Sequence, residues 1–86
     1  MNGSVRVNGF VRNEKGEAVS CHVRVGDGPF IKNSSFKGYF SIPNCPSGFQ
    51  KIEVVPDVDN YFAESFTNLL APNSSNNVGI ITVKEK

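Results

Sequence analysis

Tryptophan is absent from the 86-residue sequence, and histidine occurs only once. A structural zinc site needs three or four ligands, and the two cysteines do not form a Cys-x-x-Cys pair that could supply them. Nine basic and eight acidic side chains give a net charge of +1, so bulk charge drives binding neither to nucleic acid nor to an anionic membrane surface. No apolar run approaches the roughly 20 residues of a membrane span. Met1 to Val7 also lacks the apolar core of a signal peptide.

The residues that are present are typical of a globular chain. A hydrophobic fraction of 38% beside 20% charged residues argues against disorder, in spite of several Asn- and Ser-rich patches. The length allows one domain, which we expect to span residues 1–86 with a charged, solvated tail at 84–86.

Hydrophobic residues alternate with polar ones along most of the chain, and turn signals interrupt this alternation every 8 to 12 residues. This pattern is typical of short β-strands with one buried face. We expect strands over 4–13, 18–25, 30–31, 39–42, 49–55 and 78–83, with the two prolines between Pro43 and Gly48 marking a loop. Gly9 falls on the inner side of its strand, where it predicts either a gap filled by a neighbouring aromatic ring or a bulge.

Residues 57–72 are ambiguous, because their apolar residues recur at helical spacing while the segment also ends in a strand-like run. We expect a short helix or turn at its start and a strand after it. The whole then predicts an all-β fold, a seven-strand antiparallel β-sandwich with at most one short helix. Its expected core is Val5, Val7, Val11, Val19, Cys21, Val23, Val25, Phe40, Ile42, Ile52 and Val54, with several of Phe30, Phe36, Phe62 and Phe66.

The order of these features resembles the carboxypeptidase regulatory-like domain, a β-sandwich of the transthyretin-like type. The matching pieces, in order, are Val5 to Val11, Gly16-Glu17-Ala18-Val19, Gly38-Tyr39-Phe40-Ser41-Ile42, Cys45-Pro46-Ser47-Gly48, Ile52-x-Val54, Asn60-Tyr61 and Val78 to Val83. Three departures are Ser34-Ser35 for a usual Thr-Asp, Cys45 for Leu and Asn60 for Gly. The resemblance implies an accessory module without chemistry of its own.

A second, fainter similarity is to the collagen-adhesin B-type domain of bacterial surface proteins, through Glu53, Pro56 and Tyr61. The isopeptide bond of that family needs a lysine on the first strand. This strand offers Arg6 and Arg12 instead, so we expect the cross-link to be absent.

Five outward-facing residues of the first two strands form the candidate partner-binding face: Arg6, Phe10, Arg12, His22 and Arg24. If both strands lie in one sheet, they create a small basic surface with an aromatic ring in its middle, which suits an anionic partner surface. Outward charges that merely keep a sheet soluble are the competing interpretation.

Catalytic and metal sites find little support in the sequence. His22 and Ser20 share one face of a strand, but no third group is evident to orient them. The Asp57-Val58-Asp59-Asn60 segment places oxygens at alternate positions, as calcium sites do, yet only Glu64 adds a nearby ligand. Cys21 and Cys45 are expected to be buried, reduced thiols. We therefore expect no catalytic residues, no metal and no cofactor.

The expected function is that of a non-catalytic interaction or structural module, displayed on a larger assembly such as a virion or a bacterial surface or secreted protein. Its expected partner is a protein. The alternative is a small carbohydrate-binding module, for which Tyr39 and Tyr61 are the only available tyrosines.

Overall fold

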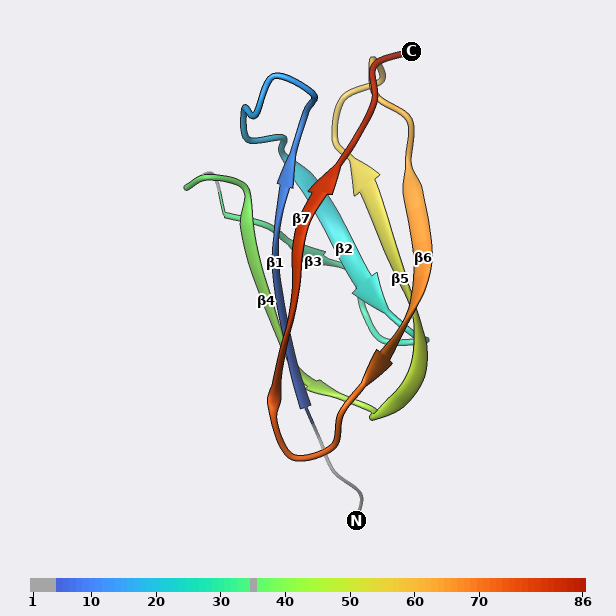
Figure 1. Ribbon diagram of the computed structural model, residues 1–86. Coiled ribbons are helices and arrows are strands. Elements are labelled where there is room, and N and C mark those ends of the chain that lie inside the picture. The colour runs from blue at the N-terminus through green and yellow to red at the C-terminus, as the bar shows by residue number, and fades with distance from the viewer. Residues whose placement is uncertain (1–4, 35) are drawn as a thin grey trace.

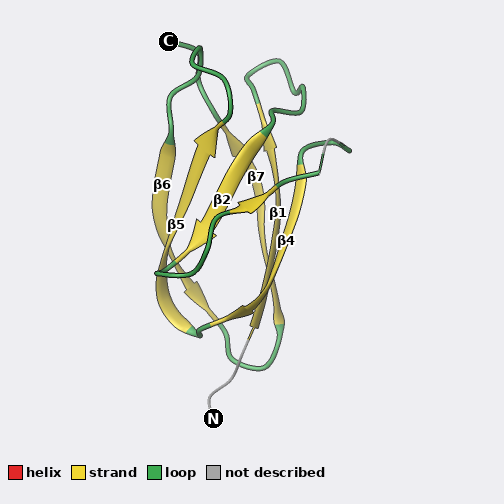
Figure 2. Ribbon diagram, turned by 180° about the vertical axis from the view of Figure 1, so that it is seen from behind, coloured by secondary structure: helices red, strands yellow, loops and turns green. Residues whose placement is uncertain are grey.

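The computed structural model describes residues 5–34 and 36–86, and within them it contains seven β-strands and no helix. The strands are β1 (Val5–Arg12), β2 (Cys21–Val25), β3 (Ile31–Lys32), β4 (Tyr39–Cys45), β5 (Gly48–Pro56), β6 (Glu64–Leu70) and β7 (Ser75–Thr82). They form two layers, a three-stranded sheet in the order β4-β1-β7 and a four-stranded sheet in the order β3-β2-β5-β6 (Figures 1 and 2). The predicted all-β sandwich is thereby confirmed.

The sheets are not purely antiparallel, in contrast to the prediction. β1 runs parallel to β7, with Arg6 opposite Ser75 and Arg12 opposite Thr82, and their arrowheads point the same way in Figure 1. All other strand pairs are antiparallel. The sheet is mixed because the first and last strands are direct neighbours. The alternation of side chains predicts which face of a strand is buried, but not which strand lies beside it.

All eleven aliphatic, cysteine and phenylalanine residues named individually as core residues are buried. The four further phenylalanines behave differently: only Phe66 packs against the core, whereas Phe30, Phe36 and Phe62 are 41%, 68% and 50% exposed. Among the described residues, the buried core consists largely of β-branched side chains, with Phe40 as its one fully buried aromatic residue. Each of the three exposed rings instead lies beside a cation, which offsets part of its exposure.

Two segments expected to be irregular take part in pairing. β4 continues through Pro43 to Cys45, which is tolerated because β4 is an edge strand and its proline needs no ladder partner on the open side. The 84–86 tail is paired with the loop before β6: Lys84 accepts a hydrogen bond from the Phe62 amide, and the Lys86 amide donates to Asn60, both at 2.9 Å. The backbone of the tail is therefore paired, while its three side chains are exposed.

The ambiguous segment resolves into a turn at 57–60 followed by β6, so the helical alternative is wrong. The apolar residues that recur at helical spacing lie partly on this strand. Phe66 and Leu70 face the core, whereas Leu69 faces solvent. Two residues named in the sequence analysis lie outside the described residues. They are Ser4, the first residue of the strand expected over 4–13, and Ser35, which was compared with the family's Thr-Asp pair.

Candidate partner-binding face

The five predicted face residues do not lie together. β1 carries Arg6, Phe10 and Arg12 on the outer side of the three-stranded sheet, whereas β2 carries His22 and Arg24 on the outer side of the four-stranded sheet. The prediction required β1 and β2 to share a sheet, and they face each other across the core instead. The five residues therefore belong to two separate surfaces.

An apolar row crosses the three-stranded sheet on its outer surface. Phe10 on β1 is directly opposite Tyr39 on β4 and Ile80 on β7. The ring centroids of Phe10 and Tyr39 are 5.3 Å apart and the ring planes are inclined by 58°, a tilted arrangement that aromatic pairs prefer. Tyr39 is 37% and Ile80 57% exposed, so the row is open to a partner.

We call this surface the Phe10 face. It comprises Arg6, Asn8, Phe10, Arg12, Tyr39, Ser41 and Ile80. Sequence reasoning placed Phe10 here but missed Tyr39 and Ile80. That Tyr39 and Ile80 face outward could be predicted, because each is next to an inward-facing residue, Phe40 or Ile81. The register that aligns them with Phe10 could not be predicted.

Both arginines of this face are held in place by neutral groups. The Arg12 guanidinium lies 4.9 Å above the centre of the Phe10 ring, and its Nε donates to the carbonyl of Lys37 at 3.3 Å. Arg6 Nη1 donates to Ser41 Oγ at 2.8 Å, and that hydroxyl donates to Asn8 Oδ1 at the same distance. The side chains are thus oriented while their positive charges stay uncompensated.

Charge is distributed unequally between the two sheets. β1, β4 and β7 contain no aspartate or glutamate, and Arg6 and Arg12 are the charged residues of these strands. Among residues 5–34 and 36–86, no ion pair within 4.0 Å involves either arginine. The Phe10 face is therefore basic without an internal counter-charge.

The outer side of the four-stranded sheet neutralises its own charges. Arg24 on β2 pairs with Glu53 on β5 at 2.7 Å, and Lys51 lies 3.9 Å from the same carboxylate. The hydrogen bond from Arg24 lowers the pKa of Glu53 below its usual value, in spite of partial desolvation. Arg24 also covers the Phe30 ring at 4.6 Å.

Asp57, just after β5, contacts three other polar side chains on this surface. Its carboxylate contacts His22 Nδ1 at 2.7 Å and the Ser20 hydroxyl at 2.9 Å, with Lys32 Nζ at 3.3 Å. Partial burial would raise the pKa of Asp57, but the hydrogen bonds from His22, Ser20 and Lys32 together hold it below its usual value.

This cluster does not have the geometry of a catalytic triad. Ser20 and His22 both bond to Asp57, so the carboxylate lies between the hydroxyl and the imidazole. A nucleophilic serine needs a direct hydrogen bond to its base, and none joins Ser20 to His22. Within the described residues there is also no group of three His, Cys, Asp or Glu side chains able to hold a metal ion.

The two cysteines are free and buried, on β2 and β4 in different sheets. Burial raises the pKa of the Cys21 thiol to about 11, and the nearby Asp57 carboxylate adds to the effect against the opposing charge of Lys32. Burial likewise raises the pKa of Cys45, with Arg6 opposing. Neutral, enclosed thiols are poor nucleophiles, so both cysteines act as core residues.

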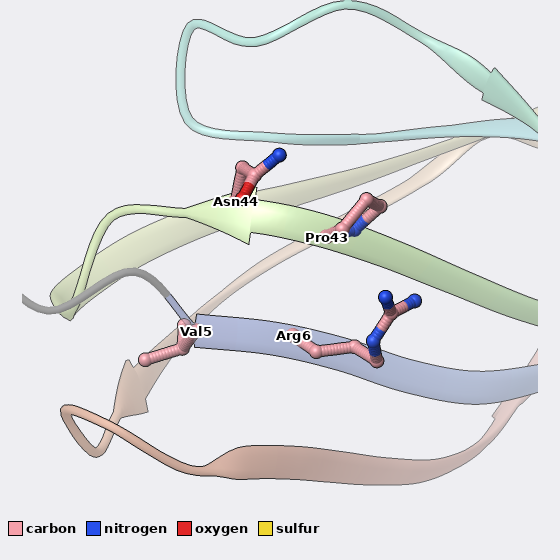
Figure 3. A pocket seen from close by; sticks show the side chains of 4 residues that line it. All are labelled: Val5, Arg6, Pro43 and Asn44. Carbon is pink, nitrogen blue, oxygen red and sulfur yellow. The ribbon is translucent and has the colours of Figure 1, made fainter.

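Within the described part of the chain, a shallow hollow lies beside each of the two surfaces. One, of about 350 Å³, is lined by His22, Phe30 and Val55 on the four-stranded sheet. The other, of about 180 Å³, lies at the start of β1 and is lined by Val5, Arg6, Pro43 and Asn44 (Figure 3). In Figure 3 the Arg6 side chain extends from β1 toward β4.

The two tyrosines lie in different environments. Tyr39 belongs to the Phe10 face, whereas Tyr61 packs partly against the core and its hydroxyl accepts a hydrogen bond from Asn13 at 3.1 Å. They do not form one stacking platform for a sugar.

No helix in the part of the chain described here is long and apolar enough to cross a membrane.

No protein-family model and no curated protein matches the sequence. Solved structures do resemble the fold. A chain of a type II cohesin–X–dockerin complex of Acetivibrio cellulolyticus, a C-terminal interface mutant, has a TM-score of 0.73 at 14% identity, covering 92% of this chain and 56% of its own. The corresponding N-terminal interface mutant gives 0.71 at 14% identity, with 94% and 58% covered.

The Bacillus anthracis TIE protein is similar over 98% of this chain, with a TM-score of 0.67 and 14% identity. The chain spans little more than half of the first two structures and 16% of the third. Likeness at this identity establishes the fold alone. It supports a β-sandwich, and not the carboxypeptidase regulatory-like family in particular.

Proposed function

We propose that this chain is a non-catalytic protein-interaction module that docks through its Phe10 face onto a protein partner in a larger assembly. The observation that carries the proposal is the exposed row of Tyr39, Phe10 and Ile80 beside two arginines without counter-charges. The cores of protein interfaces are enriched in aromatic residues and arginine, which carry most of the binding energy there.

The setting of the assembly follows the expectation from sequence, a virion or a bacterial surface or secreted protein. The matched structures support the protein partner rather than the setting, because two of them are complexes of cohesin with X–dockerin. The lack of an assembled nucleophile and base at Ser20 and His22 further favours a binding role over catalysis.

Sugar binding is the weaker candidate. A stacking platform presents a flat, unobstructed ring, but Phe10 and Tyr39 are tilted by 58° and the face of Phe10 is covered by Arg12. A glycan array that gave specific binding lost on Tyr39→Ala would favour this alternative.

Site-directed photo-crosslinking tests the proposal. A photoreactive phenylalanine analogue replaces Tyr39 in one variant and Phe49 in a control, since Phe49 is 74% exposed on the other sheet. In the native source, the Tyr39 variant should form a covalent adduct with one discrete protein, and the Phe49 variant should not. Adducts from Phe49 alone, or from neither position, would refute docking through the Phe10 face.

A further inference from the structure

We infer that the partner segment bound by the Phe10 face is acidic, with aspartate or glutamate side chains flanking an apolar one. This inference rests on the proposed function and adds the chemistry of the partner. The two sheets differ in how their charges are paired: the four ion pairs of the described residues involve His22, Arg24, Lys32 and Lys51, all on the four-stranded sheet.

The uncompensated charges lie at two separate points of the Phe10 face. Arg12 is two residues from Phe10 along β1, and Arg6 is four residues away in the other direction. At about 3.3 Å per residue, the two guanidinium-bearing positions are roughly 20 Å apart, with the apolar row between them. A small anion reaches only one of these points, whereas a protein segment with separated carboxylates reaches both.

Each arginine keeps donors for a carboxylate. Arg6 uses Nη1 for Ser41 and Arg12 uses Nε for Lys37, so other guanidinium N–H groups remain for bidentate binding. The hollow lined by Val5, Arg6, Pro43 and Asn44 gives an acidic side chain room beside Arg6 (Figure 3). At the other point, Arg12 is stacked on Phe10, so a carboxylate bound there brings its neighbouring side chain onto the apolar row.

The same charges argue against two other occupants. A second copy of the chain would bring two faces together that each carry two arginine charges and no acidic residue in their strands, which is repulsive. A polyanion such as DNA is recognised by a continuous basic stripe, and here two arginines are separated by an apolar row in a chain of net charge +1.

Selection from a random linear peptide library, displayed on phage and panned against the full chain, tests the inference. The selected sequences should place aspartate or glutamate next to aromatic or aliphatic residues. A synthetic peptide of that consensus should bind about tenfold more weakly to the Arg6→Gln/Arg12→Gln double variant. The Lys15→Gln/Lys51→Gln double variant removes the same charge elsewhere and should change affinity by less than about twofold.

Three outcomes would overturn the inference. Peptides that lack acidic residues but lose binding on Phe10→Ala would refute the acidic partner and leave the proposed docking face intact. Peptides indifferent to both Phe10→Ala and the arginine changes would refute this partner chemistry, while the photo-crosslinking at Tyr39 decides the docking face independently. Displacement of the acidic peptide by DNA or heparin at lower concentration would assign the face to a polyanion instead.

Discussion

The ring of Phe40 occupies the space that Gly9 leaves by having no side chain. The two residues are cross-strand partners on β1 and β4, and a Cβ at Gly9 would lie 2.7 Å from Cζ of Phe40 and 2.8 Å from Cγ2 of Val78. The β1–β7 register also shifts between Asn8 and Phe10, but there β7 advances three residues against two on β1, so the extra residue lies on β7 opposite Gly9. Of the two interpretations of this glycine from sequence, the gap filled by an aromatic ring is confirmed, whereas a bulge in its own strand is not.

Phe40→Ala should lower the free energy of unfolding by about 3–5 kcal/mol, because it removes the largest fully buried side chain and leaves a cavity above Gly9. Phe36→Ala is the matched control, since Phe36 is 68% exposed, and it should change stability by less than about 0.5 kcal/mol. Urea titrations of both variants measure the difference. Equal midpoints would show that Phe40 does not support the core.

Gly38→Ala should destabilise the protein strongly, by more than about 2 kcal/mol. Gly38 has a φ of +74°, and a Cβ there would lie 2.1 Å from the carbonyl oxygen of Val11, whose amide donates to the Gly38 carbonyl. Gly16→Ala is the control: its φ is +83° but nothing lies within 4 Å, so only backbone strain of about 1 kcal/mol is expected. If both substitutions cost the same, the contact with Val11 has no effect of its own.

Side-chain alternation was enough to predict which residues of the strands face inward, because burial on one face imposes a period of two. Val19, Cys21, Val23 and Val25 illustrate this, as all four are buried. Alternation within a strand contains no information about which strands become neighbours. The parallel pairing of β1 with β7, and the separation of β1 from β2, were therefore not predictable, and with them the composition of the Phe10 face.

Loop residues escaped prediction for a different reason. Asn33 lies just beyond the strand expected over 30–31, yet it is 5% exposed. Its side chain accepts a hydrogen bond from the Cys21 amide at 2.9 Å and donates one to the Val19 carbonyl at 2.8 Å. A polar residue is buried when backbone groups satisfy it, and those groups come from remote segments. Conversely, several of Phe30, Phe36, Phe62 and Phe66 were expected inside, but Phe30 and Phe62 are exposed and lie beside Arg24 and Lys86.

The two cysteines should resist alkylation in the native protein and react fully in denaturant without any reductant. Both thiols are buried, and the pKa of Cys21 is raised to about 11, so little thiolate exists near neutral pH. Mass spectrometry after iodoacetamide should show no label on the folded chain and two labels on the unfolded chain. An unfolded chain that took up no label would mean that Cys21 and Cys45 form a disulfide.

Stability should fall in acid through the Asp57 cluster. The pKa of Asp57 is lower in the folded state than in the unfolded chain, where it is about 3.9. Its contribution is therefore complete above about pH 4 and is lost as pH falls through the lower folded value. Glu53, whose pKa is also lowered, contributes in the same direction.

Melting temperatures measured from pH 7 to pH 2 test this linkage. Asp57→Asn should flatten the acid limb, because the variant has no carboxylate to protonate at that position. Asp59→Asn, which removes the same charge from the exposed turn, is the matched control. An unchanged slope in Asp57→Asn would show that the contacts with His22, Ser20 and Lys32 do not stabilise the fold.

The most direct test of the Phe10 face as the docking surface is NMR mapping with the protein captured by photo-crosslinking. Adding that unlabelled partner to the 15N-labelled chain should shift or broaden amide signals of β4, β1 and β7, centred on Phe10, Tyr39 and Ile80. Signals of β3, β2, β5 and β6 should move little, and Phe10→Ala should abolish the effect. Perturbations centred instead on Phe49 and Leu69, the exposed apolar pair of the opposite sheet, would contradict the account.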